Sequence, residues 1–277
     1  MILDEISSLL LPDWEHRKTI LNFESWLMLK RREATMKLEV SEIFGPTLQG
    51  EGPSIGKPAT FIRLRRCNLQ CTWCDTKYTW DKNDPGYSFF ASMNYHEIAG
   101  LALLKHGGVS TRLIVITGGE PLIWRTQLIE LVRVHFTDEV ATPQYRIEIE
   151  TNGTIHPRTL ADLSNVFFNV SPKLSSSGND DLKTIRDEPM KFFSDMAMMN
   201  KAIFKFVLSD LRSDGVEIID IVQKYKIPSH SVYLMPQGTT VKEIVEGSQA
   251  VFALAISKGW NATTRLHTLA YGNRRGI

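Results

Sequence analysis

The chain is predicted to fold as an α/β domain with a parallel sheet and outer helices. From Met36 onward, short apolar runs of strand length alternate with longer helical patterns in this sequence of 277 residues. Such alternation is typical of βα units, whose strands pair in parallel. The motifs that carry chemistry each follow one of the strand-like runs. We therefore expect a functional site on the loops at the carboxyl ends of the strands.

The elements are expected in a regular order. Strands are expected at residues 38–44, 61–64, 113–116, 146–149, 166–170, 203–207, 232–235 and 264–266. Helices are expected at residues 95–105, 127–135, 216–224 and 241–258. Asn94, with Glu97 close behind it, predicts a capped start for the first of these helices. The serine-rich stretch at residues 174–181 is the most loop-like part of the chain.

Residues 1–35 are predicted to form a separate, helical N-terminal extension ahead of the main domain at residues 36–277. Pro12 suits the first turn of a helix, and the basic residues at 30–32 favour a helix C-terminus. We expect the extension to pack on its own domain and to be dispensable. The alternative is a helix that binds a partner.

Composition and charge narrow the class of protein. With 43% hydrophobic residues, the chain is long enough to bury one sizeable core. Its net charge of +1 indicates no strong field, so neither nucleic acid nor an anionic membrane is expected as a partner. The sequence shows no secretory signal and no apolar run of bilayer length. Clustered reduced cysteines favour the cytoplasm.

The three cysteines of the chain, Cys67, Cys71 and Cys74, lie in one stretch with the spacing C-x3-C-x2-C. Thiolates suit iron–sulfur clusters, and three of them leave one iron of a four-iron cluster open to a substrate or cofactor. The alternatives are a zinc site or three buried thiols. Structural zinc usually has four ligands, and the nearest histidine, His96, lies far downstream. The spacing therefore favours a 4Fe–4S cluster with an open iron.

The cysteine motif resembles the signature of radical S-adenosylmethionine (SAM) enzymes. An apolar strand that leads into a Gly-Gly-Glu-Pro loop at residues 118–121 is a second feature of that superfamily. Further segments narrow the resemblance to the 7-carboxy-7-deazaguanine synthase (QueE) family; they lie at residues 44–52, 58–69, 73–76, 150–153, 171–173, 235–238 and 265–277. The resemblance covers residues 36–277, which is nearly the whole chain.

This resemblance implies a partial TIM-type barrel that is open on one side. It also implies radical-mediated conversion of 6-carboxy-5,6,7,8-tetrahydropterin to 7-carboxy-7-deazaguanine with release of ammonia, in queuosine-type biosynthesis. The implied cofactors are a 4Fe–4S cluster, SAM and Mg²⁺. The implied partners are an electron donor such as flavodoxin or ferredoxin and a second copy of the chain. The alternatives are a glycyl-radical-enzyme activase, which shares both motifs, and a non-catalytic iron–sulfur or zinc module.

The resemblance further implies roles for individual residues. Cys67, Cys71 and Cys74 bind the cluster, and the Thr76 hydroxyl ligates Mg²⁺; the alternative for Thr76 is an ordinary turn hydroxyl. The residues implied to bind SAM are Trp73, Cys74, Asp75, Gly119, Glu120, Ser171, Pro172, Lys173 and Gln237. Those implied to bind the substrate are Leu48, Gln49, Gly50, Glu51, Arg63, Thr117, His267 and Ile277.

The chemistry of the substrate residues agrees with these roles. The amide of Gln49 and the carboxylate of Glu51 can recognise the mixed donors and acceptors of a pterin edge. Arg63 can hold a carboxylate through two parallel hydrogen bonds. The simpler alternatives are a solvated turn for the first two and a strand-edge salt bridge for Arg63. Near the tail, Tyr271 and Asn273 stand where many relatives carry tryptophan and an acidic residue.

Overall fold

The protein is described from a computed structural model that covers residues 36–108, 112–136, 145–180, 184–272 and 274–276. Residue contacts divide the chain between Lys37 and Leu38, and everything below concerns the second unit, Leu38–Ile277. The predicted N-terminal extension at residues 1–35 lies outside the described residues. Among those that are described, no helix has the length and apolarity needed to cross a bilayer.

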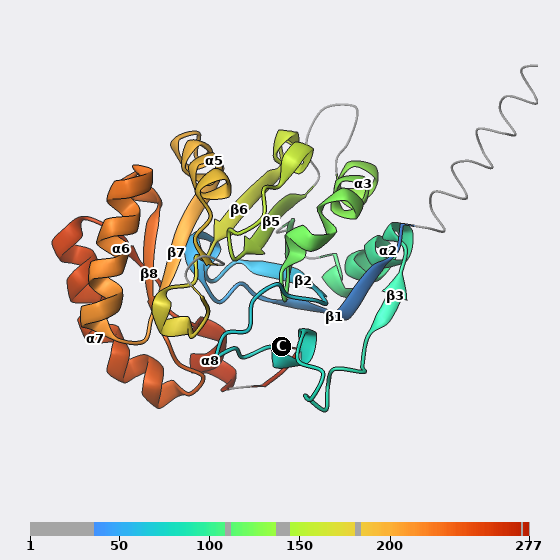
Figure 1. Ribbon diagram of the computed structural model, residues 1–277. Coiled ribbons are helices and arrows are strands. Elements are labelled where there is room, and N and C mark those ends of the chain that lie inside the picture. The colour runs from blue at the N-terminus through green and yellow to red at the C-terminus, as the bar shows by residue number, and fades with distance from the viewer. Residues whose placement is uncertain (1–35, 109–111, 137–144, 181–183, 273, 277) are drawn as a thin grey trace, which may run out of the picture. The chain divides into compact units, whose positions relative to one another are not determined.

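A single curved sheet organises the described part of the chain (Figure 1). Its strands are β1 (Leu38–Leu48), β2 (Pro58–Leu64), β3 (Ala91–Met93), β4 (Leu113–Gly118), β5 (Arg146–Thr151), β6 (Val166–Val170), β7 (Ala202–Leu208), β8 (Val232–Pro236) and β9 (Asn261–Ala262). They lie side by side in the order β3-β1-β2-β4-β5-β6-β7-β8-β9. β1 is antiparallel to β2 and β3, whereas the pairings from β2 to β9 are parallel. The sheet does not close, since β3 and β9 are its edges, and the predicted open α/β architecture is confirmed.

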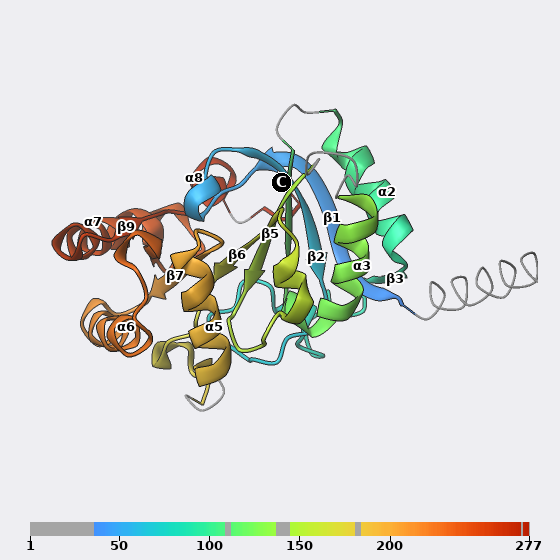
Figure 2. The same ribbon diagram turned by 90° about the horizontal axis from the view of Figure 1, so that it is seen from above.

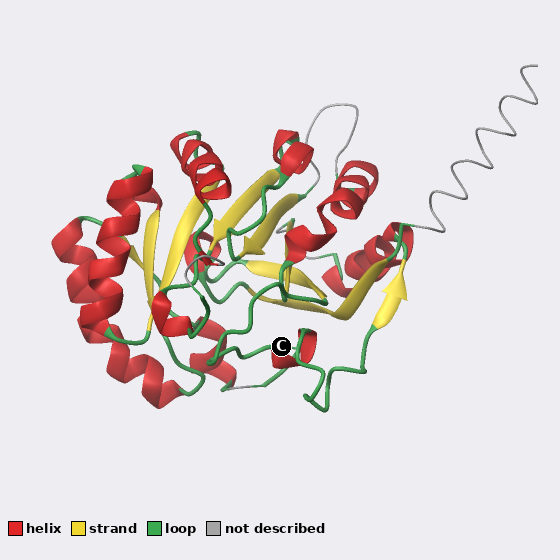
Figure 3. Ribbon diagram, viewed as in Figure 1, coloured by secondary structure: helices red, strands yellow, loops and turns green. Residues whose placement is uncertain are grey.

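Helices lie along the outer side of the sheet (Figures 2 and 3). They are α2 (Tyr95–His106), α3 (Arg125–His135), α5 (Asp187–Met198), α6 (Leu211–Tyr225) and α7 (Val241–Lys258). The short helix α8 (Leu266–Tyr271) instead contributes His267 and Thr268 to the site described below. Short 3₁₀ turns form at Gly52–Ser54, Lys77–Thr79, Pro121–Trp124, Arg158–Asp162, Ser175–Ser177 and Ser229–Ser231. The cap predicted at Asn94 is confirmed: its side chain accepts from the backbone N–H of Glu97, whose carboxylate accepts from Asn94 N.

Two differences from the expected elements have local physical reasons. Helix α5 was not predicted, and it contains Pro189. The helix tolerates this proline because it falls in the first turn, where a missing N–H costs no intrahelical hydrogen bond. The strand expected at residues 264–266 is wrong, because Leu266 begins α8 and β9 lies earlier. Leu266 N donates to Gly50 O at 2.9 Å, and this tertiary contact overrides the strand preference of the two threonines that precede Arg265.

The strands direct apolar and polar side chains to opposite faces. On β5, β6 and β7, every second residue packs in the main core under the helices, as Ile149, Phe168 and Phe204 do. The alternate residues point to the inner face and include Glu148, Asn169 and Lys205. Because side chains alternate along a strand, a buried polar layer forms on the inner face of the sheet. Lys205 of this layer lines the site described next.

Candidate active site

A cleft of about 480 Å³ opens at the carboxyl ends of the strands. It brings together residues from the loops after β1, β2, β4, β5, β6 and β8. Of the residues predicted for the site, those that line it are Leu48, Gln49, Glu51, Arg63, Cys67, Cys71, Trp73, Cys74, Asp75, Thr76, Thr117, Gly119, Ser171, Lys173, Gln237 and His267. Gly50, Glu120 and Pro172 do not line it, and Ile277 lies outside the described residues.

The glycines after β4 allow the cysteine loop to lie against the sheet. A Cβ added to Gly118, which has φ +151°, would lie 2.1 Å from Leu64 O, and one added to Gly119 would lie 2.1 Å from Arg66 O. Glu120 N donates to that same Arg66 oxygen at 2.7 Å. Only glycine tolerates such a backbone approach. The Gly-Gly-Glu-Pro loop therefore fixes the start of the cysteine loop.

The three thiols receive N–H donors from the surrounding chain. Asn179 Nδ2 lies 3.2 Å from Cys71 Sγ, and Trp80 Nε1 lies 3.3 Å from Cys74 Sγ. Leu69 N lies 3.5 Å from Cys67 Sγ. Thiolate ligands of a metal carry negative charge on sulfur, and N–H donors of this kind stabilise that charge.

Burial alone works against ionisation of two of these thiols. It raises the pKa of Cys67 to about 12 and also raises the pKa of Cys71. A bound metal group reverses this effect, because coordination deprotonates a thiol outright. In the part of the chain that the structure describes, no group of three or more His, Cys, Asp or Glu side chains is arranged to hold a single metal ion. Three soft donors on one loop, each with an N–H partner, fit a cluster with three protein ligands.

Glu120, predicted to contact SAM, lies next to the cleft without lining it. Its side chain is fully buried; it accepts from Leu122 N at 2.9 Å, Thr151 Oγ1 at 2.7 Å and Asn152 N at 2.7 Å. Burial raises the pKa of Glu120, while these hydrogen bonds act in the opposite direction. The carboxylate thus joins the loops after β4 and β5 from behind the cleft.

The loop after β6 contributes Ser171 and Lys173 to the wall of the cleft. Lys173 Nζ donates to Ser171 O at 2.9 Å and to Ser171 Oγ at 3.0 Å, which holds the ammonium beside the cleft. The same ammonium lies 5.9 Å from the ring centre of Trp73. Trp73 Nε1 donates to Ser176 O at 3.3 Å, so the tryptophan ties the cysteine loop to this wall.

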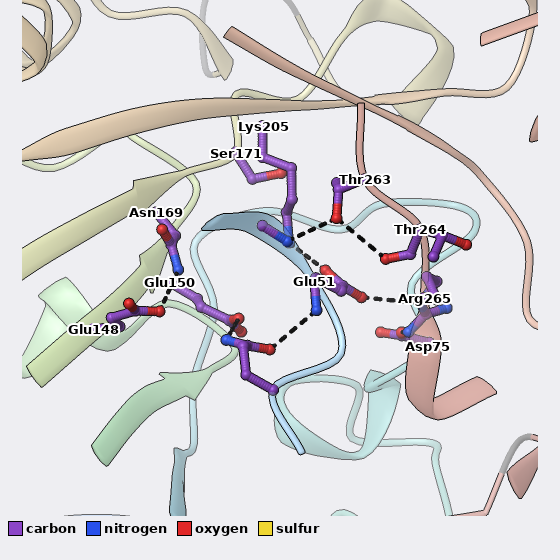
Figure 4. Close-up of polar contacts among 12 residues, drawn as sticks. Glu51, Asp75, Glu148, Glu150, Asn169, Ser171, Lys205, Thr263, Thr264 and Arg265 are labelled. Carbon is purple, nitrogen blue, oxygen red and sulfur yellow. Dashed lines mark hydrogen bonds and ion pairs between the residues drawn. The ribbon is translucent and has the colours of Figure 1, made fainter. Parts of the chain in front are cut away.

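Glu51 is the centre of a buried charge network (Figure 4). It forms ion pairs with Lys205, which reaches inward from β7, and with Arg265, whose Nε lies 3.0 Å from Glu51 Oε1. Burial disfavours the ionised carboxylate, but the two cations outweigh that effect and hold the pKa of Glu51 far below its usual range. Gln49 Oε1 accepts from Glu51 N at 3.2 Å, and its amide nitrogen donates to Glu150 at 3.2 Å. A carboxylate that stays ionised acts only as a hydrogen-bond acceptor.

Arg265 connects three segments of the cleft wall. Besides Glu51, it pairs with Asp75 of the cysteine loop and donates from Nη1 to Gly238 O at 2.8 Å. Two residues further on, His267 fills the space above Gly50, where an added Cβ would lie 1.9 Å from His267 Nδ1. Burial lowers the pKa of His267, with Glu51 acting in the opposite direction, and the lowered pKa favours the neutral imidazole.

Arg63 reaches the cleft already paired. Its Nε donates to Glu42 Oε1 at 2.7 Å, and the same oxygen accepts from the Tyr78 hydroxyl at 2.7 Å. Arg275 Nε donates to Glu42 Oε2 at 3.3 Å. Burial raises the pKa of Glu42, but the partners of this carboxylate, mainly Arg63, lower it by more, so the pKa of Glu42 lies below its usual value. Glu42 thus gathers two guanidinium groups and a phenol at one end of the cleft.

Thr76 lines the cleft and carries one hydroxyl. Its Oγ1 lies 3.6 Å from Cys74 Sγ, and its carbonyl accepts from Thr79 N at 2.9 Å and from Thr79 Oγ1 at 2.8 Å. The neighbouring Asp75 carboxylate is taken by Arg265. A single hydroxyl suits Mg²⁺, which keeps most of its ligands as water and substrate oxygens.

Sequence reasoning missed several residues of the cleft as site residues, notably Glu42, Tyr78, Glu150, Lys205 and Arg265. Glu150 and Arg265 stand in segments that carried the family resemblance, but no role was assigned to them. Lys205 did offer a signal: it is a lone charge in the middle of the apolar strand AIFKFVL. A buried lysine of that kind requires an acidic partner.

Comparison with known proteins shows the family of the chain. The model of the radical SAM superfamily matches residues 61–247. The 7-carboxy-7-deazaguanine synthase of Pyrobaculum aerophilum is 36% identical over 244 residues, which are 88% of this chain and 99% of the relative. The enzyme of that name from Rhodopirellula baltica is 31% identical over 254 residues, or 88% and 91% of the two chains.

The fold is also found in a solved structure. The crystal structure of QueE from Escherichia coli superposes with a TM-score of 0.60 at 24% identity, covering 85% of this chain and 96% of that one. The protein is thus a radical SAM protein, and this class implies a 4Fe–4S cluster and SAM. Within that superfamily the chain belongs to the 7-carboxy-7-deazaguanine synthase family.

Proposed function

We propose that the protein converts 6-carboxy-5,6,7,8-tetrahydropterin to 7-carboxy-7-deazaguanine and ammonia. The product and ammonia together contain all the atoms of the substrate, so the ring contraction needs no net oxidant. The observation that supports this reaction best is the position of Glu51, an ionised acceptor in the same cleft as the three cysteines. Turnover of the carboxypterin by anaerobically reconstituted protein tests the proposal.

The residues of the cleft have separate tasks in this reaction. When bound, the cluster and SAM supply hydrogen-atom abstraction by a 5′-deoxyadenosyl radical. Cys67, Cys71 and Cys74 hold the cluster. Gln49 and Glu51 bind the donor and acceptor edge of the pterin. The protein otherwise orients the reacting carbon and excludes water, which is how a cofactor enzyme contributes to rate.

The substrate carboxylate is expected at the Arg63 end of the cleft, beside Thr76. Arg63 shares Glu42 with Arg275, so the local charge remains positive and favours an anion. Mg²⁺ on the Thr76 hydroxyl orients the carboxylate and neutralises part of its charge. A flavodoxin or ferredoxin is the expected electron donor, and a homodimer is the expected assembly.

The magnesium role predicts a difference between two replacements at Thr76. Thr76→Ser keeps an oxygen ligand and should keep substantial activity. Thr76→Val is nearly isosteric but lacks the oxygen, so it should lose stimulation by Mg²⁺ and about a hundredfold in rate, the usual cost of misplacing a substrate by roughly 1 Å. Activity measured as a function of Mg²⁺ concentration distinguishes the two replacements.

Thr72 provides a matched control for that measurement. It lies on the same loop, but its hydroxyl donates to Ser177 O at 3.3 Å instead of facing the cleft. Thr72→Val should therefore keep the Mg²⁺ dependence of the unaltered protein. A Thr76→Val protein with the same Mg²⁺ dependence would reduce Thr76 to a turn residue.

The proposed division of the chain predicts that residues 1–35 are dispensable. A chain that begins at Met36 should fold and remain active, since every residue of the cleft lies beyond that point. Circular dichroism and turnover of the shortened protein measure this. Insolubility or lost activity would show instead that the extension supports the domain.

A further inference from the structure

We propose that Trp80 and Asn179 set the reduction potential of the cluster by donating hydrogen bonds to the sulfur atoms of Cys74 and Cys71. Neither residue was assigned a role by the motifs. The inference rests on the proposed function, because it requires the cluster to bind at these cysteines. Its basis is the geometry of two side-chain N–H groups that approach two different ligand atoms.

Trp80 is held in place by the turn that precedes it. Its backbone N donates to Lys77 O at 3.0 Å, and Thr79 O accepts from Arg66 N at 2.9 Å. The turn is thereby fixed to the residue that begins the cysteine loop. From this position Trp80 Nε1 reaches Cys74 Sγ at 3.3 Å. Since an indole nitrogen can only donate, the sulfur is the acceptor.

A hydrogen bond from Gln70 N determines which end of the Asn179 side chain is the amide oxygen. Its Oδ1 accepts from Gln70 N at 2.8 Å, and because a backbone amide only donates, the other end of the side chain must be the NH₂ group. That group lies 3.2 Å from Cys71 Sγ and 3.1 Å from Ser177 Oγ. Thr72 N also donates to Ser177 O at 3.0 Å, so the Asn179 loop is tied to the cysteine loop at several points.

Both hydrogen bonds shift the reduction potential of the cluster in the same direction. Reduction adds negative charge to the cluster and its sulfur ligands, and an N–H donor stabilises that charge more in the reduced state than in the oxidised state. Hydrogen bonds to sulfur are among the factors that set iron–sulfur potentials. The two donors therefore raise the potential and make the cluster easier to reduce by a physiological donor.

The test is an EPR-monitored redox titration of anaerobically reconstituted protein without SAM. Trp80→Phe removes one N–H and keeps an aromatic ring, and Asn179→Leu removes the other at similar size. Each should hold its cluster and shift the midpoint potential to a more negative value. The double variant should shift by about the sum of the two, since the donors act on different sulfurs.

Trp73→Phe is the matched control for the potential. This tryptophan lies on the same loop, but its Nε1 donates to a backbone oxygen, Ser176 O, at 3.3 Å. Its removal should leave the midpoint potential unchanged. Unchanged potentials in both Trp80→Phe and Asn179→Leu, with full cluster content, would overturn the inference. Failure of the unaltered protein to take up iron and sulfide would instead overturn the proposed function.

A measurement on the unaltered protein covers the case in which a variant loses its cluster. With ¹⁵N-labelled tryptophan, pulsed EPR of the reduced protein should detect a ¹⁵N hyperfine coupling from the indole of Trp80. The coupling should persist in Trp73→Phe. Its absence from the labelled protein would contradict a hydrogen bond between Trp80 and Cys74.

Discussion

Cys71→Ala is expected to abolish both SAM cleavage and product formation. The variant keeps two thiols on a loop that needs three, and a four-iron cluster held by two protein ligands leaves two irons open instead of one. Cys71 is buried, and Asn179 Nδ2 is directed at its sulfur, so no solvent ligand replaces it in the same geometry. Iron and sulfide content, the cluster absorption band and formation of 5′-deoxyadenosine measure the loss together.

Met199 offers a control with a sulfur atom outside the site. It is 61% exposed at the end of α5 and does not line the cleft. Met199→Ala should keep cluster content and turnover. A Cys71→Ala protein with normal turnover would rule out the assignment of the three cysteines to a catalytic cluster.

Lys205→Met is expected to raise the KM for the carboxypterin by about a hundredfold near neutral pH. Methionine matches the length of the lysine chain but removes the ammonium that pairs with Glu51. Removing one partner of a buried ion pair leaves an uncompensated charge, at a cost on the order of 3–5 kcal/mol. Arg265 remains beside Glu51 and offsets part of that cost. Cluster content should be unchanged, because no cysteine contact involves Lys205.

The pH dependence of the Lys205→Met protein follows from the same pair. With Lys205 present, the pKa of Glu51 lies far below its usual range, and Glu51 stays ionised across the working pH range. Without Lys205 that pKa rises, so lowering the pH protonates Glu51 and weakens substrate binding, and raising the pH restores it. Two other titratable groups, Arg265 and His267, act directly on Glu51. Glu150 acts on Lys205 and His267, and Asp75 acts on Arg265 and His267.

Lys205→Arg is the matched control, because it retains the positive charge and should keep a KM that changes little with pH. Because Glu51 and His267 act on each other, the two groups titrate together, and the KM profile reports the pair. Steady-state KM values between pH 6 and pH 9, measured for the three proteins, give the profile. A Lys205→Met protein with the same KM profile as the unaltered one would contradict the role of Lys205.

Much of the site could be predicted because its residues lie in short, contiguous motifs. The three cysteines, Thr76 and the Gly-Gly-Glu-Pro loop can each be recognised from a few neighbouring positions. The structure places the cysteines, Thr76 and the two glycines of that loop around one cleft. The strands could be predicted for a similar reason. Apolar runs at the centre of a parallel sheet are buried on both faces and stand out from their surroundings.

The residues that were missed depend on partners far away in the sequence. Lys205 and Glu51 are 154 residues apart, and Arg265 and Glu51 are 214 apart. No local pattern reports such a pair. The direction of the Glu120 side chain likewise depends on the backbone of Asn152, in the loop after β5.

The central claim is tested most directly by the product of the reaction. The anaerobically reconstituted protein is incubated with SAM, a chemical reductant, Mg²⁺ and 6-carboxy-5,6,7,8-tetrahydropterin, and the mixture is analysed by mass spectrometry. The account predicts accumulation of 7-carboxy-7-deazaguanine and ammonia in equal amounts, while SAM is largely unconsumed. Stoichiometric loss of SAM with no deazapurine, or with a glycyl radical formed on a partner protein, would contradict it.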